Sequence, residues 1–445
     1  MQMSMRVSMR VRTRPRRWLA AIGVAALTAT VTTVATAPAG AATDSFFTYT
    51  GSAPLSSYQP GDVLKTRTLK YSLDGIKLPL DVTQLLYRTT DAQGRPTANV
   101  TSVLRTPLAK TTNKAIAYGS FYDSLNPEDG PSRGVVGSTN IGAQTAHVET
   151  LIAVPFLLQG YSVIVADTQG PTADFAAGPE YGYTTLDSIR AVAAASASTG
   201  VSTDARVGLI GYSGGAIATN WAAALAPSYA PDVNSRLVGA AEGGVLVFPA
   251  HNLDYVSGSL VWAGVAPMAL IGAARAYGID FAPYLSEYGA KVVAKLEKAS
   301  IAQALGAYPG LTFAKLVKPQ YADPTTIPPY VETVNKLNLG SAPTPTVPMF
   351  IGQGSNGLLE GTKGIGKGDG VMVAGDVRAL ARQYCRTNTK ITYTQYDLTS
   401  HFTSALLWIP SAVAWMTARF ANIQPPTNCG AIKPGNSLAP LTVTP

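Results

Sequence analysis

The chain has 445 residues, of which 46% are apolar and 13% are charged, and its formal net charge at pH 7 is +8. This composition is typical of a protein with a large buried core and excludes an intrinsically disordered chain. Residues 1–42 hold six arginines and no acidic residue, so the rest of the chain carries only +2, which gives no support to nucleic-acid binding.

Residues 1–42 predict a secretory signal peptide. Basic residues come first, an apolar run over residues 18–37 follows, and small residues close the segment. Together these features mark a segment that is removed on export. Cleavage after Ala41 or Ala42 would release a secreted chain. The route would be the general one or, because Arg16-Arg17 loosely resembles a twin-arginine signal, the twin-arginine one.

The next segment, residues 43–247, predicts a sheet. Alternating apolar and polar residues between Leu64 and Leu104 favour antiparallel strands. Short apolar strands then alternate with helices, a pattern typical of a parallel sheet that helices cover on both faces. The fold class is therefore α/β. Strands are expected at residues 115–118, 162–166 and 207–210, and helices at residues 186–197 and 214–226.

Residues 248–345 interrupt this alternation and predict a helical cap inserted into the α/β fold. Their longest apolar stretch, residues 260–274, is too short to cross a bilayer, so we expect no transmembrane segment. Residues 425–445 are rich in proline and asparagine and predict a surface tail. Between the cap and the tail the α/β pattern resumes over residues 346–424, with strands expected at 349–351 and 391–396 and a helix at 377–384.

The motif that carries chemistry is Gly211-Tyr212-Ser213-Gly214-Gly215. The pattern Gly-x-Ser-x-Gly is weak by itself, because in a chain with 42 glycines it can mark an ordinary turn. Here an apolar strand leads into the motif and a helix of small residues follows, which is the arrangement of a nucleophile elbow. The N-terminus of that helix places positive potential where an oxyanion would form. We therefore predict that Ser213 is a catalytic nucleophile.

A serine hydroxyl needs a general base, and the chain has three histidines. In this arrangement the residues follow the order serine, acid, histidine. His147 precedes Ser213, and His251 follows it too closely to leave room for an acid-bearing strand, so a structural or pocket-lining role is expected for His251. The predicted base is His401, which lies between an expected strand and an apolar helix.

The acid is expected in the loop after the strand at residues 349–351. Glu360, Asp369 and Asp376 all qualify by position. Asp376 is expected to cap the following helix, and Glu360 lies in a glycine-rich stretch nearer the strand. Asp369 has room to point at His401, so we predict Asp369 as the acid and keep the other two as alternatives.

An oxyanion hole requires two donors. One should be the backbone N–H of Gly214, and the other should come from the loop at residues 119–124, where composition does not select a residue. No cofactor or metal is predicted. The glycine-rich stretch at residues 364–368 lacks the spacing of a dinucleotide-binding motif, and no His, Cys and Asp residues have the spacing of a zinc site.

The two cysteines, Cys385 and Cys429, form an even pair in a chain with an export signal. Such a pair predicts a disulfide. Closing a loop of this size stabilises a fold by about 4 kcal/mol in the chain-entropy model.

Several segments together resemble the secretory lipase family of yeasts and actinobacteria, and the resemblance covers nearly all of the chain after residue 42. It implies an α/β-hydrolase fold with a large helical cap that forms an acyl-binding tunnel. It also implies activity on acylglycerols and other fatty-acid esters. The matching segments are Tyr122–Ser124, Leu186–Ala191, Gly211–Gly215, Ala226–Pro231, Gly239–Gly244 and the run from Gly368 through Cys385 to His401.

The same resemblance implies roles for individual residues. The residues that match are Ser213, Asp369 and His401 as the triad, Asp123 and Gly214 as the oxyanion pair, and Cys385 and Cys429 as a disulfide.

The chain departs from the family in two places. Glu128–Ser132 stands where members often carry another cysteine, and the acid loop at residues 352–368 is longer and richer in glycine than in the family.

These patterns predict a secreted serine hydrolase that cleaves fatty-acid esters, in solution or at a lipid–water interface. A secreted peptidase or acyltransferase is one alternative, because the fold does not fix the substrate. The other is a non-catalytic binding protein of the cell envelope. Reactivity of Ser213 and a preference for esters over anilides would separate the three.

Overall fold

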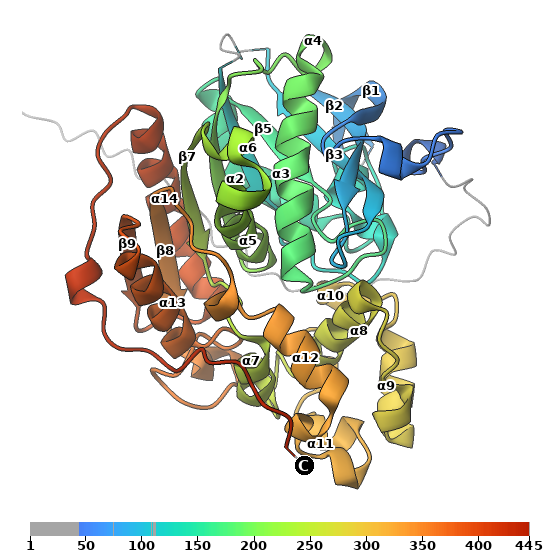
Figure 1. Cartoon of the computed structure of the whole chain (residues 1–445), viewed down its shortest axis with the longest axis vertical. Coiled ribbons are helices and arrows are strands. Elements are labelled where there is room, and N and C mark those ends of the chain that lie inside the picture. Colours follow the sequence, from blue (N-terminus) through green and yellow to red (C-terminus); the bar gives the residue numbers. More distant parts are fainter. Residues whose placement is uncertain (1–43, 74, 108, 110–112, 445) are drawn as a thin grey trace, which may run out of the picture. The chain divides into compact units, whose positions relative to one another are not determined.

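A nine-stranded sheet organises the chain, whose computed structural model describes residues 44–444 apart from residues 74, 108 and 110–112 (Figure 1). The predicted signal peptide lies outside the described residues. Across the sheet the order is β1-β2-β3-β5-β4-β6-β7-β8-β9. The strands are β1 (Val63–Leu73), β2 (Ile76–Thr90), β3 (Pro96–Arg105), β4 (Lys114–Gly119), β5 (Ser162–Ala166), β6 (Arg206–Tyr212), β7 (Leu237–Gly243), β8 (Met349–Gly354) and β9 (Ile391–Tyr396).

The sheet begins antiparallel and continues parallel. β1, β2, β3 and β5 pair antiparallel in that order, and each neighbouring pair from β5–β4 to β8–β9 is parallel. This arrangement confirms the predicted α/β class and the predicted change of strand direction. Because the carboxyl ends of parallel strands meet at one edge of a sheet, the loops after β4, β6, β8 and β9 gather there.

Helices cover both faces of the sheet, and its central strands β4 to β8 are buried along almost their whole length. In β4, Ala115 and Ala117 join the core under α3 and α5, whereas Ile116 and Tyr118 join the core under α2 and α14. The helices of these layers are α1 (Pro131–Gly134), α2 (Thr145–Leu158), α3 (Gly178–Ala194), α4 (Ser196–Thr199), α5 (Gly214–Tyr229), α6 (Pro231–Asn234), α13 (Ala374–Arg386) and α14 (His401–Phe420).

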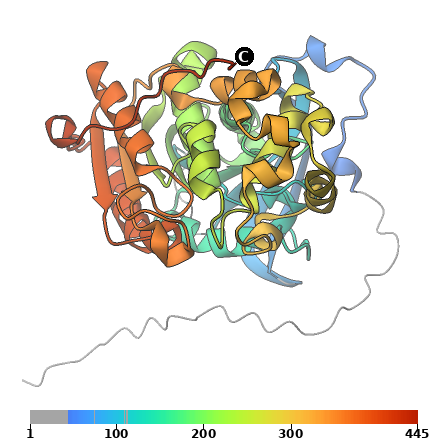
Figure 2. The same ribbon diagram turned by 90° about the horizontal axis from the view of Figure 1, so that it is seen from below.

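The segment between β7 and β8 is helical and has an apolar core of its own. Figures 1 and 2 show its helices gathered at one end of the sheet. No helix in the described part of the chain is long and apolar enough to cross a membrane. The helices of this segment are α7 (Pro249–Val256), α8 (Val265–Tyr277), α9 (Glu287–Leu296), α10 (Ile301–Ala304), α11 (Phe313–Leu316) and α12 (Pro328–Lys336).

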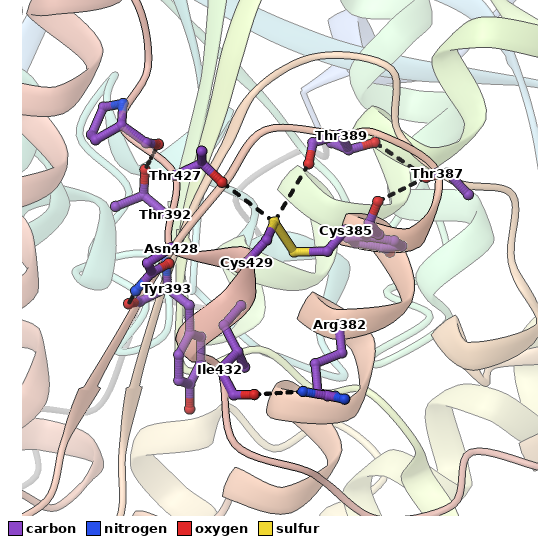
Figure 3. The surroundings of a disulfide bond; sticks show 12 residues. Arg382, Cys385, Thr387, Thr389, Thr392, Tyr393, Thr427, Asn428, Cys429 and Ile432 are labelled. Atoms are coloured by element: carbon purple, nitrogen blue, oxygen red, sulfur yellow. Dashed lines mark hydrogen bonds between the residues drawn. A yellow bond between two sulfur atoms is a disulfide. The ribbon is translucent and has the colours of Figure 1, made fainter.

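Residues 425–444, here named the C-terminal strap, run along the surface as a mostly exposed segment that is fixed to the fold at several points. Cys429 is bonded to Cys385 of α13, as predicted (Figure 3). Ile432 is buried, and further along the backbone N–H of Leu441 donates to Oδ1 of Asn335 on α12 at 2.8 Å. The strap therefore links the sheet layers to the helical segment.

Candidate active site

Ser213 lies in a sharp turn between β6 and α5. Its φ of +56° and ψ of −121° are strained for a residue that has a Cβ. A Cβ on Gly211 would lie 2.1 Å from the carbonyl oxygen of Gly215, and a Cβ on Gly215 would lie 2.0 Å from that of Gly119. The backbones approach so closely that only glycine fits on either side of the serine.

The three residues predicted as a triad lie in hydrogen-bonding series. Nε2 of His401 is 2.8 Å from Oγ of Ser213, and Nδ1 of His401 is 2.8 Å from Oδ2 of Asp369. His401 is buried at the start of α14, directly after the helix N-cap Ser400. The three side chains follow β6, β8 and β9, so the parallel strands bring them to the same edge of the sheet.

Four nitrogen groups of the protein contact the carboxylate of Asp369, which is fully buried. Oδ1 accepts from the backbone N–H groups of Val371 at 3.1 Å and Met372 at 2.8 Å. Oδ2 accepts from Nε2 of Gln353 at 3.0 Å and also lies beside Nδ1 of His401. The carboxylate is thus held in one orientation, with one oxygen fixed on the backbone and the other on the imidazole.

The other two acid candidates contact other groups. Asp376 pairs with His251, whose Nδ1 lies 3.0 Å from the carboxylate. The expectation that Asp376 caps a helix is wrong, because α13 begins at Ala374 and its N-cap is Val373. Glu360 does not contact Nδ1 of His401. Of these three acids, all of them described in the structure, only Asp369 has its carboxylate at hydrogen-bonding distance from the imidazole of His401.

Glu360 instead joins the helical segment to α14. Its buried carboxylate accepts from the indole N–H of Trp262 at 2.6 Å and from the backbone N–H of Phe402 at 2.9 Å. The Trp262 ring lies edge-on against His401, with centroids 5.2 Å apart, and stacks on the Phe402 ring at 5.3 Å. Glu360 thus holds an aromatic ring against the imidazole. No local sequence pattern predicts this contact, because Trp262 and Glu360 are 98 positions apart.

Burial and three carboxylates set the pKa of His401. Burial lowers this pKa, but Asp369, Glu360 and Asp123 outweigh burial and raise the pKa above its ordinary value. A base must be unprotonated to accept a proton, so activity that depends on His401 should fall as the pH drops below this raised pKa.

We expect Glu360→Gln to move the acid limb of the kcat/KM profile to lower pH, because one of the carboxylates that raise the pKa of His401 is removed. We also expect kcat/KM at the optimum to fall about tenfold, since the amide leaves one of two buried N–H groups without an acceptor. Rates on a soluble p-nitrophenyl ester from pH 4 to pH 9 test both effects. Glu332→Gln makes the same change at an exposed carboxylate and should leave the profile unmoved; an equal shift in both variants would contradict the assignment.

Asp123 and Gly214, the oxyanion pair implied by the family resemblance, lie together beside Ser213. A Cβ on Gly214 would lie 2.0 Å from Oδ1 of Asp123, so the carboxyl group lies directly over this glycine. Burial raises the pKa of Asp123 to about 7, although the charge of His401 and a 3.2 Å bond from Nε2 of Gln169 oppose this rise. Below that pKa the carboxyl is neutral and can donate a hydrogen bond.

Two residues that the sequence did not single out support this loop. Glu149, on α2, accepts from the hydroxyl of Ser120 at 2.6 Å and from the backbone N–H of Phe121. Gln169 accepts from the backbone N–H of Ser124 at 3.1 Å while it donates to Asp123. Both act from other parts of the fold, so no local pattern predicts them.

An apolar cavity of about 100 Å³ lies over Ser213 and Asp123. Its walls come mostly from the helical segment, and a second cavity of about 350 Å³ follows within that segment. The two cavities share Leu270, Phe281 and Tyr330. Two adjoining apolar cavities of this kind suit a hydrocarbon chain that starts at the serine.

Comparisons with known proteins identify the family of the chain. A family model described as "Secretory lipase" matches residues 137–428. Lipase 6 of Candida albicans is 31% identical over 392 residues, covering 84% of this chain and 80% of that lipase. Lipase 1 of the same yeast is 30% identical over 390 residues, covering 84% and 79%. Candida antarctica lipase A, solved in its closed state, has the same fold with a TM-score of 0.76 and 24% identity, covering 89% of this chain and 90% of that one. The chain therefore belongs to the secretory lipase family of the α/β-hydrolase superfamily and is a lipase or carboxylesterase.

Proposed function

We propose that the chain hydrolyses fatty-acid esters through an acyl-enzyme on Ser213, with His401 as the base and Asp369 as the acid. The observation that carries this proposal is the pair of 2.8 Å contacts that places His401 between the other two residues, beside an apolar cavity. A polar triad that faces apolar walls suits a substrate with a reactive carbonyl and a long hydrocarbon chain.

Acylation begins when Oγ of Ser213 attacks the ester carbonyl carbon while Nε2 of His401 takes the hydroxyl proton. Asp369 accepts from Nδ1–H and stabilises the imidazolium that forms. The oxyanion faces the N–H of Gly214, at the positive end of α5, and the carboxyl of Asp123. The imidazolium then gives its proton to the departing alcohol, and water attacks the acyl-enzyme in the same way to release the acid.

The remaining parts of the chain take their proposed roles from this reaction. Residues 248–345 form a cap, whose two cavities hold the acyl chain. Residues 43–247 and 346–424 form the catalytic core. Residues 1–42 direct export and are removed, so the enzyme acts outside the cell; the description of the family as secretory supports this assignment.

Labelling with a fluorophosphonate and a substrate series test the proposal together. We expect the label to bind the wild type and not Ser213→Ala, and p-nitrophenyl esters of increasing chain length to be hydrolysed faster than aminoacyl anilides. A folded wild type that takes no label would indicate a non-catalytic binding protein. Faster turnover of anilides would indicate a peptidase, and ester formation exceeding hydrolysis in water containing an alcohol would indicate an acyltransferase.

The carboxyl of Asp123 makes the proposal pH-dependent on the alkaline side. Because its pKa is raised to about 7, the group is a neutral donor below that pH and a negative charge facing the oxyanion above it. We therefore expect kcat/KM to fall as the pH rises through about 7, and Asp123→Asn, whose amide is neutral at every pH, to lack this fall. Asparagine also tolerates the φ of +30° found here. An alkaline limb that persists unchanged in the asparagine variant would contradict the role.

A further inference from the structure

The glycine-rich loop at residues 357–367 has no part in the proposed reaction apart from its buried Glu360. The loop begins with the short helix Gly357–Glu360, and Asn356 and Ile365 form an isolated antiparallel bridge that closes it. Gly361, Gly364 and Gly366 have positive φ values of 72°, 99° and 79°. The course of this loop depends on these glycines, because other residues rarely adopt such backbone angles.

Large apolar side chains point outward from this loop and from the segments beside it. They are between 50% and 82% exposed. Exposed apolar residues that occur singly need no explanation, but a contiguous group marks an interaction surface. We name this group the apolar rim; its members are Leu260, Leu358, Leu359, Ile365, Leu398, Phe402 and Leu406.

Contacts between their segments make the rim continuous. The side chain of Leu260 lies against Gly361, where an added Cβ would be 2.5 Å from Cβ of Leu260. The backbone N–H of Phe402 reaches Glu360, which directly follows Leu359. Thr399, the residue after Leu398, accepts from the backbone N–H of Asn356, the bridge partner of Ile365, at 2.9 Å. Leu406 follows Phe402 by one turn of α14.

The rim lies one aromatic ring away from the catalytic centre. Phe402 stacks on Trp262, and Trp262 both lines the cavity over Ser213 and lies against His401. A surface that binds to the rim therefore lies next to the wall of the cavity over Ser213.

The charge of the loop is positive. Lys363 and Lys367 are exposed, and within the described part of the chain neither forms an ion pair. The acid of the loop, Glu360, turns inward to Trp262 and Phe402. The nearby Asp397 is exposed and accepts from Ser355 and Gln395. The loop thus presents apolar side chains together with two cations.

We propose that the apolar rim, with Lys363 and Lys367, docks the enzyme on an anionic lipid surface. The free energy falls when leucine, isoleucine and phenylalanine side chains move from water into the acyl region of a lipid layer. Lysines are attracted to negative lipid headgroups. The choice of ester as the substrate rests on the proposed function, whereas the docking does not require catalysis. Docking here places the cavity against aggregated substrate.

Sedimentation with lipid vesicles tests the proposal with residues 43–445 carrying Ser213→Ala, a substitution that removes nearly all ester hydrolysis. Residues 1–42 are left out because their arginines and apolar run would themselves bind anionic vesicles. We expect the Ser213→Ala protein to partition onto vesicles of phosphatidylcholine with phosphatidylglycerol. Lys363→Gln/Lys367→Gln should weaken this partitioning about twenty-fold, and 0.5 M salt should remove most of the difference. Leu358→Ser/Leu359→Ser should weaken it at least tenfold on any vesicle.

Matched controls change the same residue types elsewhere. Lys390→Gln/Lys433→Gln removes two exposed lysines, and Leu158→Ser/Ile423→Ser removes two exposed apolar side chains, outside the rim. Equal losses in loop and control variants, or equal partitioning onto neutral and anionic vesicles, would overturn the proposal. So would a lipid-free dimer that Leu358→Ser/Leu359→Ser abolishes, because the rim would then contact a second copy. Docking without hydrolysis by the wild type would contradict the proposed function alone, and hydrolysis of a soluble ester without docking would contradict the docking alone.

Discussion

Replacing Ser213 with alanine is expected to lower kcat for ester hydrolysis about a millionfold, because nucleophile and base act as one unit and little of the acceleration survives the loss of either. The remaining rate would come from the oxyanion hole and from substrate binding. Initial rates on p-nitrophenyl butyrate measure the loss. A variant that keeps a tenth of the wild-type rate would contradict the assignment of Ser213.

Ser213→Gly provides a companion measurement on stability. Glycine adopts a φ of +56° without strain, whereas alanine keeps the strained Cβ of the wild type. We therefore expect the glycine variant to be as inactive as the alanine variant and about 1 kcal/mol more stable to denaturant. Equal unfolding free energies for the two variants would show that the turn is not strained.

Asp369→Asn is expected to lower kcat about ten-thousandfold. The amide oxygen should stay on the backbone N–H groups of Val371 and Met372, since an N–H cannot replace an acceptor there. The amide NH₂ would then face Nδ1 of His401. This contact favours the tautomer with the proton on Nε2, which cannot accept the proton of Ser213.

Asp376→Asn is the matched control, because it makes the same change at a buried carboxylate in the first turn of α13, close to Asp369 in the chain. Asp376 contacts His251 rather than His401, so kcat should change less than threefold. The wild type and both variants should be compared by kcat and by thermal unfolding. A large loss of kcat in Asp376→Asn, with little loss in Asp369→Asn, would reverse the assignment of the acid.

Local patterns predicted those parts of the fold that are continuous in sequence. The strand, turn and helix around Ser213 needed no tertiary information, and the order of residues singled out His401. The sequence does not predict β7, because after Leu237 and Val238 the strand continues with glycine, alanine and one glutamate rather than with branched residues. Its place between β6 and β8 comes from close packing: a Cβ on Gly239 would lie 2.8 Å from Trp415.

The surroundings of the triad could not be predicted from sequence because they depend on pairs that only folding brings together. A family resemblance points to Asp123, since composition alone does not select it from its loop. Glu149 and Gln169, which hold that loop, act from α2 and from the loop after β5. Glu360 qualifies by its position in the sequence as an acid for His401, whereas its contact with Trp262 depends on how the helical segment meets the sheet.

The C-terminal strap connects the disulfide at Cys385 with one wall of the cavity over Ser213. Its last contacts join Leu441 to Asn335 of α12 and Thr444 to Thr325, and α12 also supplies Thr333 and Val334 to that wall. A protease that cuts the exposed strap would therefore free α12 from these contacts. The shape of the cavity would then change although every residue of the triad stays in place.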